Sequence, residues 1–358
     1  MNNKAVIAMS GGVDSSVAAY LMKQRGFDCI GVTMKLFANE DIGISREHSC
    51  CSLDDVEDAR SVAYSLDMPY YVFNFSDRFE TDVIDRFVHA YENGITPNPC
   101  IDCNRYLKFD KLYMRAKELD RDYVVTGHYA RVENGENGRY LLKKALDDTK
   151  DQSYVLYCLT QEQLSHTIFP LGEMRKSQAR EIAESQGFIN ARKADSQDIC
   201  FVQNGSYADF IEQYTGKNYP DGDFLDKDGN VIGRHKGVIR YTVGQRKGLG
   251  ISAPEPLYVK AVNPVSNTVT LSYNDGLYSS VVKAGDINLI SVPEIKGEMR
   301  VKAKVRYRHT EQWATVTQNG DTITAVFDEP QRAVTCGQAL VLYDGDIVVG
   351  GGTIIEVE

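Results

Sequence analysis

The chain has 358 residues, of which 42% are hydrophobic and 25% charged, and its formal net charge is −10. This length is too great for one ordinary hydrophobic core, so two or three domains are expected. No apolar run is long enough to span a bilayer, and residues 1–12 lack the pattern of a signal peptide, which predicts a cytoplasmic protein with no membrane partner. Eight cysteines in so long a chain argue against a disulfide framework. The acidic balance argues against a protein coated in nucleic acid, but it allows a local basic surface.

The first part of the chain alternates between predicted strands and predicted helices. Short apolar runs predict strands over 4–9, 29–37, 70–75 and 123–127. Predicted helices extend from the first strand to Gly26, begin at a capping box of Ser52 and Asp55, and cover 78–92 and 106–119. This alternation predicts an α/β fold, in which a parallel sheet carries helices on both faces.

The pattern changes near residue 205. From Tyr219 onward, short β-rich runs are separated by Gly, Asn, Asp and Pro, and "NGD" (319–321) between two alternating runs predicts a hairpin. We therefore expect an antiparallel barrel or sandwich in the C-terminal part. The predicted division is 1–205, 206–285 and 286–358.

The sequence "AMSGGVDSS" (8–16) follows the first predicted strand and opens a helix. Two glycines permit a tight turn whose N–H groups can bind an anion at the positive end of the helix. The loop has no GxxxxGK[ST] pattern and lacks its phosphate-binding lysine. It carries Asp14 instead, which would repel phosphates unless Mg²⁺ lay between them. The pattern resembles the PP-loop of ATP pyrophosphatases, a resemblance that leaves the substrate open.

The sequence "NPCIDCN" (98–104) places Cys100 and Cys103 two residues apart. Two prolines favour an extended approach, so we expect both thiols in a loop just before a helix. The helix N-terminus, with Arg105 and Lys108 nearby, should favour a thiolate at Cys103. A zinc site would need a second pair of ligands at similar spacing, and the sequence offers none. Cys200, in "KADSQDICF" (193–201), is expected where a polar stretch enters an apolar strand.

Seven motifs occur in an order that resembles the tRNA-specific 2-thiouridylase family: "SGGVDSS", "TPNPCIDCNRYLKF", "TGHYAR", "DQSYVLY", "FPLG", "KADSQDICF" and "YTVGQRKGLGI". The resemblance covers nearly the whole chain. It implies a PP-loop ATP-binding catalytic domain, a small linker domain and a C-terminal β-barrel that contacts tRNA. It also implies ATP-dependent thiolation of C2 of the wobble uridine, with AMP and pyrophosphate released, by an enzyme that uses ATP and Mg²⁺.

The same resemblance implies roles for individual residues. Cys103 would be the nucleophile and Cys200 would carry a persulfide. The residues implied in ATP binding are Ala8, Met9, Ser10, Gly11, Gly12, Val13, Asp14, Ser15, Met34 and Gly127. Those implied in contacts with the target base and tRNA are Asn98, Pro99, Cys100, Lys150, Asp151, Gln152, Arg306 and Tyr307. The implied partners are tRNA and a sulfur donor, either a cysteine desulfurase or a persulfide carrier, and a monomer is favoured.

Cys100 departs from the family pattern, because many members have an aspartate there. A thiol, with a reference pKa of about 8.5 rather than 3.9, cannot serve as the same acid–base group. Members with three cysteines resemble this chain, and a [4Fe–4S] cluster has been proposed for them. Cys100, Cys103 and Cys200 therefore leave two mechanisms open, a persulfide relay, which is favoured, and sulfide delivery from a cluster. Cys50 and Cys51 have no assigned role.

The run "RVKAKVRYRH" (300–309) predicts a strand with five cations on one face: Arg300, Lys302, Lys304, Arg306 and Arg308. Such a stripe on an acidic chain favours RNA binding, and a solvated outer face of a barrel is the alternative. Two other functions remain open at this point. One is a PP-loop enzyme that adenylates a small metabolite; the other is a non-enzymatic iron–sulfur RNA-binding protein.

Overall fold

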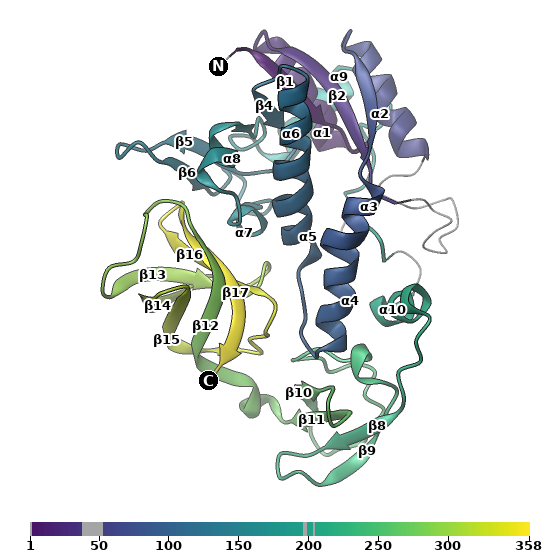
Figure 1. The fold of residues 1–358 in the computed structure, drawn as a ribbon, viewed down its shortest axis with the longest axis vertical. Helices are drawn as coiled ribbons and strands as arrows, with labels where there is room; N and C mark the ends of the chain where they lie inside the picture. Colours follow the sequence, from purple (N-terminus) through teal and green to yellow (C-terminus); the bar gives the residue numbers. More distant parts are fainter. Residues whose placement is uncertain (1, 38–52, 196–198, 203–204) are drawn as a thin grey trace.

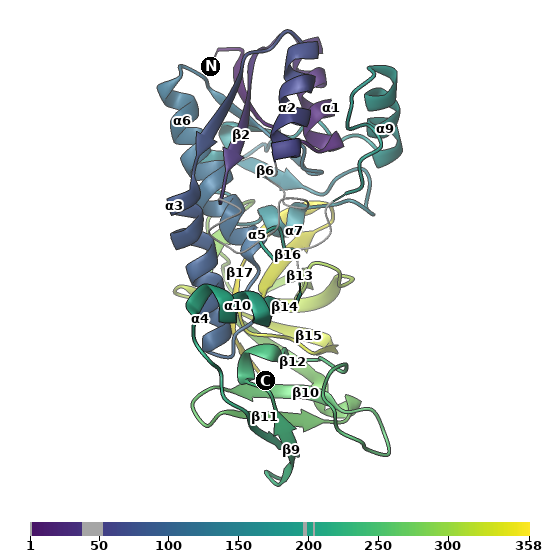
Figure 2. The same cartoon turned by 90° about the vertical axis from the view of Figure 1, so that its right-hand side faces the viewer.

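The computed structural model describes residues 2–37, 53–195, 199–202 and 205–358. A parallel sheet lies at one end of the molecule, a four-stranded sheet at the other, and a β-barrel beside two long helical segments between them (Figures 1 and 2). Within the described residues, no helix combines the length and apolarity needed to cross a membrane.

The parallel sheet has five strands in the order β3-β2-β1-β4-β7. All four strands predicted in this part of the chain are present, and the two-residue β7 is an addition that no periodicity signals. The strands are β1 (Lys4–Ala8), β2 (Asp28–Lys35), β3 (Tyr70–Asn74), β4 (Tyr123–Val125) and β7 (Thr167–Ile168). Every neighbouring pair is parallel, which confirms the predicted α/β fold.

Helices cover both faces of this sheet. Side chains alternate along β1, so Val6 packs into one apolar cluster while Ala5 and Ile7 pack into another. The second cluster is shared with α1 (Val13–Gln24), α2 (Leu53–Ser65) and α9 (Lys176–Ser185). The first is shared with two longer helical segments. The capping box predicted at Ser52 includes a residue outside the described chain, and α2 is described from Leu53.

The two longer segments are continuous helices with a wider π-type middle. One joins α3 (Ser76–Phe79), η1 (Glu80–Ile84) and α4 (Asp85–Glu92); the other joins α5 (Pro99–Asp102), η2 (Cys103–Lys111) and α6 (Leu112–Glu118). The second begins seven residues before the predicted start at 106, so placing both cysteines in a preceding loop was wrong. The reason is local: Asn98 caps the helix and Pro99 takes the first helical position, where proline is favoured.

Residues beyond 205 form two further units. Helix α10 (Tyr207–Thr215) precedes a sheet of order β10-β11-β8-β9, and η3 (Val238–Arg240) follows β9. The bounds of its strands are β8 (Gly222–Leu225), β9 (Val231–His235), β10 (Tyr258–Asn263) and β11 (Thr268–Ser272). The short η4 (Asn274–Leu277) leads into the barrel.

The C-terminal unit is a closed antiparallel barrel. Its strands follow the order β12-β15-β14-β13-β16-β17, and β17 pairs back with β12. They are β12 (Tyr278–Leu289), β13 (Met299–Lys304), β14 (Gln312–Asn319), β15 (Thr322–Arg332), β16 (Ala339–Asp344) and β17 (Ile347–Val357). The hairpin predicted at 319–321 is confirmed, because Asn319 pairs with Thr322. The domain limits of 1–205, 206–285 and 286–358 stay a prediction.

A hairpin from the first part of the chain extends toward the barrel. It consists of β5 (Arg131–Asn134) and β6 (Tyr140–Lys143), and Lys143 pairs with Ile347 of β17. Arg131 and Lys143 both form ion pairs with Asp346, in the turn between β16 and β17. Two short helices follow it, α7 (Ser153–Leu156) and α8 (Gln161–Ser165). These contacts hold the parallel-sheet unit and the barrel together in one relative position.

Candidate active site at the carboxyl end of the parallel sheet

The loop after β1 has the backbone of an anion site. Gly11 has a positive φ of 74°, and a Cβ there would lie 2.4 Å from the Asp55 carbonyl oxygen, so only glycine fits without a shift. Gly12 is the N-cap of α1. Because glycine has no side chain, it gives the first N–H groups of the described helix no side-chain acceptor. The positive end of a twelve-residue helix therefore faces the loop, as phosphate binding requires.

Two other predicted nucleotide residues lie at the same edge of the sheet. Gly127 follows β4, and a Cβ on it would lie 2.7 Å from backbone atoms of Asp14 and Ser15. Met34 lies near the end of β2, two residues after Val32, which pairs with Ala8 of β1. Ligands of open parallel sheets bind at the carboxyl ends of the strands, so these residues fit an adenine nucleotide as a group.

Asp14 is held by two residues that the sequence did not single out. Tyr129 donates a hydrogen bond of 2.8 Å from its hydroxyl to Asp14 Oδ1. Lys176 Nζ donates to both carboxylate oxygens, at 2.7 and 2.8 Å. Burial, and then the neighbouring Asp14 carboxylate, raise the pKa of Tyr129, so this hydroxyl stays protonated and remains a donor.

Asp195 extends this cluster toward the segment that contains Cys200. Its carboxylate forms ion pairs with Lys176 at 2.7 Å, Lys150 at 2.9 Å and Arg180 at 3.2 Å. Burial alone would raise the pKa of Asp195, but hydrogen bonds from Lys150 and Lys176 outweigh it and lower the pKa to about 2. Asp195 is therefore an anion at any physiological pH.

The cysteine helix presents its two thiols differently. Asn98 accepts a hydrogen bond of 3.2 Å from the backbone N–H of Cys100, whose side chain is exposed. Cys103, one turn further on, is only 8% exposed and belongs to the apolar cluster of α4 and α6. Cys200 is partly buried and packs against the same large apolar cluster, and the approach of the two predicted relay cysteines stays a prediction.

Cys200 lies in a turn, so placing it at the start of an apolar strand was wrong. The backbone N–H of Val202 donates to the Ile199 carbonyl at 2.9 Å, which closes the turn around Cys200. Residues 196–198, immediately before it, are outside the described chain, as are Cys50 and Cys51. A turn suits a cysteine that must reach different partners better than a strand would.

The barrel braces the approach to the cysteine helix. Gln338 Nε2 donates to the carbonyls of Thr96 and Pro97, at 2.9 and 3.2 Å. The backbone N–H of Thr96 donates to the Cys336 carbonyl at 3.0 Å. These contacts join the β15–β17 region of the barrel to the start of α5, and no local pattern predicted them.

Charged residues lie on the far side of the same helix. Arg105 forms an ion pair with Asp286 of β12, and Arg86 of α4 lies 3.6 Å from Asp102. Burial raises the pKa of Asp102 to about 6, although Arg86 and Arg105 act in the opposite direction. Arg105 therefore bonds to the barrel, and the expectation that it assists a Cys103 thiolate stays a prediction.

The residues predicted to contact tRNA fall into two groups that meet. Tyr307 donates a hydrogen bond of 3.2 Å to the Asp151 carbonyl. Burial, and then the charges of Asp151 and Cys100, raise the pKa of Tyr307. Gln152 exchanges backbone and side-chain hydrogen bonds with Tyr129, both at 2.9 Å. A chain of contacts thus runs from Asp14 through Tyr129 and residues 151–152 to Tyr307.

The predicted cationic stripe is shorter than expected. Strand β13 ends at Lys304, so Arg306 and Arg308 are not on it. Arg306 turns inward and donates to the Val243 carbonyl at 3.2 Å, to the Ala333 carbonyl and to Thr335 Oγ1 at 2.6 Å. The prediction of five outward cations was therefore wrong for Arg306, because its guanidinium donates to buried backbone carbonyls and a hydroxyl instead of to water.

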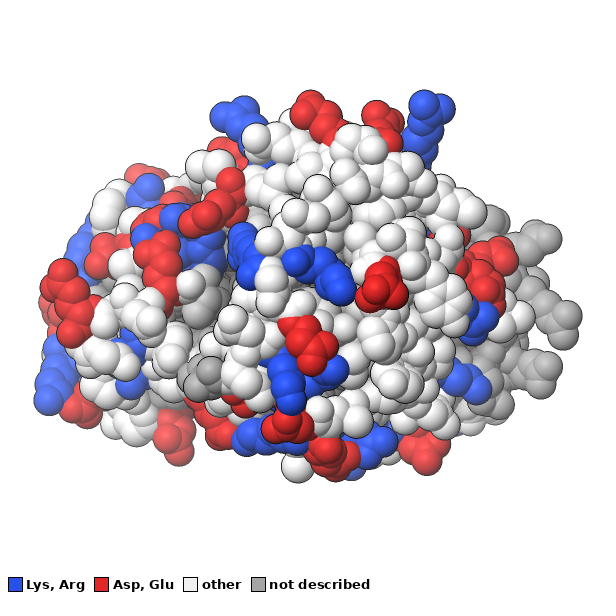
Figure 3. All heavy atoms as spheres, turned by 90° about the horizontal axis from the view of Figure 1, so that it is seen from above, with Lys and Arg blue, Asp and Glu red and all other residues white. Residues whose placement is uncertain are grey.

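The outer face of β13 retains three cations and gains an aromatic neighbour. Arg300, Lys302 and Lys304 alternate with buried Val301 and Ala303, as predicted. The guanidinium carbon of Arg300 and the Nζ of Lys302 lie 5.2 and 5.5 Å from the centroid of the Trp313 ring, which is 48% exposed. Acidic residues accompany these cations, because Arg300 pairs with Asp328 and Lys302 with Glu311. Positive and negative side chains are likewise interspersed on the face seen in Figure 3.

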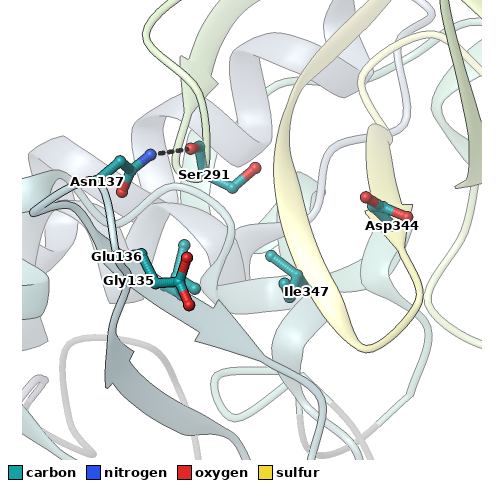
Figure 4. Close-up of a pocket in the computed structure, with 7 residues that line it drawn as sticks. Gly135, Glu136, Asn137, Ser291, Asp344 and Ile347 are labelled. Atoms are coloured by element: carbon teal, nitrogen blue, oxygen red, sulfur yellow. Dashed lines mark hydrogen bonds between the residues drawn. The ribbon is translucent and has the colours of Figure 1, made fainter.

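A pocket of about 400 Å³ lies between the β5–β6 turn and the barrel (Figure 4). Gly135, Glu136 and Asn137 line one side, and Ser291, Asp344 and Ile347 line the other. Asn137 Nδ2 donates to the Ser291 carbonyl at 3.4 Å across it. None of the predicted site residues lines it, and its two carboxylates make it unsuited to phosphate.

A metal cluster has no support in the part of the chain that the structure describes. Within those residues, no three His, Cys, Asp or Glu side chains converge to hold a metal ion. The [4Fe–4S] cluster considered at Cys100, Cys103 and Cys200 is therefore unsupported by the described residues. His128 is likewise neutral and structural, since burial lowers its pKa well below the usual value and Thr126 Oγ1 lies 2.6 Å from its Nδ1.

Three family models match the chain in succession. They are described as the tRNA methyl transferase HUP domain (residues 3–204), the tRNA methyl transferase PRC-barrel domain (208–273) and the aminomethyltransferase beta-barrel domain (279–354). Among solved structures, an NMN synthetase from Francisella tularensis is 18% identical, with a TM-score of 0.35 over 61% of this chain and 79% of that one. A likeness of that size supports no conclusion about function.

Curated relatives match over nearly the full length. A tRNA-specific 2-thiouridylase MnmA of Clostridioides difficile (strain 630) is 52% identical over 99% of this chain and 98% of its own. One of Lachnoclostridium phytofermentans is also 52% identical, over 99% of both chains. With such identity over the whole length, and with a HUP domain, a PRC-barrel domain and a β-barrel in the same order, the chain belongs to the tRNA-specific 2-thiouridylase family.

Proposed function

We propose that this protein uses ATP to replace the C2 oxygen of the wobble uridine of tRNA with sulfur. The observation that carries the proposal is the chain of contacts from Asp14 of the nucleotide loop to Tyr307 of the barrel, together with the packing of Cys103 and Cys200 in the apolar cluster of α4 and α6. The names of the relatives support the same reaction. An enzyme that adenylated a small metabolite would need neither cysteine.

The first chemical step makes the C2 oxygen a leaving group. That oxygen attacks the α-phosphorus of ATP, pyrophosphate departs, and the base becomes an O-adenylate. The N–H groups at the start of α1 would stabilise the departing negative charge. Mg²⁺ bound with ATP would supply further positive charge, and Asp14 is the loop carboxylate placed to hold it. The wobble base must leave its stack for this, at a cost of a few kcal/mol.

The second step transfers sulfur through two cysteines. The terminal sulfur of a Cys200 persulfide attacks C2, and AMP leaves with the original oxygen. The Cys103 thiolate then attacks the Cys200 sulfur of the adduct, which breaks the sulfur–sulfur bond and releases 2-thiouridine. The product is a Cys103–Cys200 disulfide, which an external thiol reduces. A cysteine desulfurase or persulfide carrier then reloads Cys200.

The cysteine roles are tested by replacing each thiol singly. Cys103→Ser and Cys200→Ser should both abolish 2-thiouridine formation, measured by mass spectrometry of tRNA nucleosides. Cys29→Ser is a matched control, because burial raises the pKa of that thiol to about 11 and the reaction has no use for it. Full activity in either of the first two variants would refute the relay. The same spectra separate thiolation from methylation, the reaction named in the description of the first family model.

The barrel face at β13 is the proposed RNA surface outside the active site. Exposed aromatic rings beside cations stack on bases and attract phosphates. Because Trp313 is the chain's single tryptophan, its fluorescence reports directly on this face. Added tRNA should quench that fluorescence with a salt-dependent affinity, and Lys302→Ala should lower the salt slope by about one. Quenching that is independent of salt would argue against phosphate contacts here.

A further inference from the structure

The nucleotide loop lacks a lysine of its own, but a lysine from another element reaches it. Lys176 is the first residue of α9 and lies about 160 positions beyond the loop in sequence. Its backbone N–H donates to Asp147 Oδ2 at 2.9 Å, which fixes the start of the helix. Its side chain is only 11% exposed, and its ammonium group contacts both oxygens of Asp14.

The ammonium group of Lys176 lies between two carboxylates. A lysine ammonium has three N–H donors, and here carboxylates take all of them: Asp14 on one side and Asp195 on the other. Asp195 also forms ion pairs with Lys150 and Arg180, so its negative charge does not depend on Lys176 alone for a positive partner. On the other side, the described partners of the Asp14 carboxylate are the Lys176 ammonium and the neutral hydroxyl of Tyr129.

Phosphates at the start of α1 would lie beside Asp14, which sits in the first turn of that helix. A carboxylate there repels them unless a cation stands between. Lys176 supplies that cation from within the protein. If Asp14 held a divalent metal ion that came with the nucleotide, the ammonium of Lys176 would be released to bind the phosphates.

We propose that Lys176 binds the β- and γ-phosphates of ATP, and the pyrophosphate formed from them, in place of the lysine that the loop lacks. Asp195 is the positioning residue that holds Lys176 there. The inference rests on the proposed ATP-dependent function and names one further binding residue for it. It also assigns a role to Asp195, which lies five residues before Cys200 in the sequence.

The test compares three nucleotides on one variant. Lys176→Met keeps the length of the side chain and removes the charge. Binding of ATP, pyrophosphate and AMP is measured by calorimetry with Mg²⁺ and without tRNA. Affinity for ATP and pyrophosphate should fall at least about tenfold, the usual worth of a charged hydrogen bond, while AMP binding stays within about twofold. AMP is the discriminating ligand because it has neither the β- nor the γ-phosphate.

Arg192→Gln is the matched control. Arg192 forms an ion pair with Glu184 of α9, the helix that Lys176 begins, and its side chain is 92% exposed. This variant should bind all three ligands like the wild type. Lys176→Arg, which keeps the charge, should recover part of the ATP affinity and guards against misreading a folding defect.

Each result has a defined meaning. Unchanged ATP and pyrophosphate affinity in Lys176→Met would overturn the inference and leave the proposed function standing. Equal losses for ATP and AMP would also overturn it, since they would show that Lys176 only shapes the loop. A wild-type protein that bound no ATP would refute the proposed function together with the inference.

Discussion

The nucleotide loop and the cysteine helix differ in how much of the molecule each one needs. The loop is shaped by nearby backbone: Gly11 fits under Asp55, and Gly127 fits against Asp14 and Ser15, all within the parallel-sheet unit. The cysteine helix depends on distant parts, because Gln338 of the barrel holds Thr96 and Pro97. We therefore expect ATP binding to depend on the first unit alone, and the proposed sulfur transfer to depend on the barrel as well.

The largest effect is expected from a substitution that distorts the nucleotide loop alone. A Cβ at Gly127 would lie 2.7 Å from the backbone of Asp14 and Ser15, so Gly127→Ala must push the loop out of shape. ATP affinity should fall about a hundredfold, near the upper end of the 1–3 kcal/mol typical of overpacking, while tRNA quenching of Trp313 stays unchanged. Calorimetry and fluorescence measure the two effects. Gly285→Ala is the control, since a Cβ there meets only the Ile355 side chain at 3.5 Å. Normal ATP affinity in Gly127→Ala would contradict this account of the loop.

A second change addresses the charge between the two cysteines. Burial is the main reason that the pKa of Asp102 is raised to about 6 from its ordinary value of 3.8. The folded protein therefore binds more protons than the unfolded chain between these values, and stability falls as pH rises through that window. The total fall is about 3 kcal/mol. Asp102→Asn should remove it.

Urea unfolding of the wild type and Asp102→Asn, followed from pH 4 to pH 7.5, measures this effect. The variant should gain stability relative to the wild type up to about pH 6, and the difference should then level off. Curves that stay parallel across the whole range would show that Asp102 is not buried as described.

The smallest effect separates the barrel brace from nucleotide binding. Gln338→Ala removes two hydrogen bonds to the approach of the cysteine helix, which typically contribute about 1 kcal/mol each. The thiolation rate should fall about tenfold with ATP affinity unchanged. Gln318→Ala, in the same barrel but bonded to Ile295 and Gly320, should leave the rate as it was. Equal effects of both changes would mean that the barrel, rather than this brace, had been damaged.

The elements found by sequence reasoning are those with a local signature. Strand periodicity located β1 to β4, and the glycine pattern located the loop, because both are determined by residues close in the chain. The start of α5 was missed because the prolines at 97 and 99 were taken as helix breakers, whereas Pro99 stands at the one position where a helix accepts it. The two-residue β7 is defined only by its partner β4.

The site residues that were missed act across long sequence separations. Lys176 lies in an ordinary amphipathic helix, and only its contact with Asp14 shows its place in the site. Gln338 lies in a barrel loop, and its hydrogen bonds are made to residues 96 and 97. Arg306 was assigned to an outward face because alternation was extended past Lys304, where the strand ends and the carbonyls of Val243 and Ala333 draw it inward. Such partners are fixed by the tertiary fold, which single-sequence patterns do not contain.

In the proposed reaction, sulfur is transferred through Cys200 and Cys103. The most direct test is a single turnover in the absence of reductant, with persulfide-loaded protein, ATP and tRNA, followed by peptide and nucleoside mass spectrometry. The account predicts a new disulfide between Cys103 and Cys200 in an amount equal to the 2-thiouridine formed at the wobble position. Formation of 2-thiouridine with no such disulfide would contradict it.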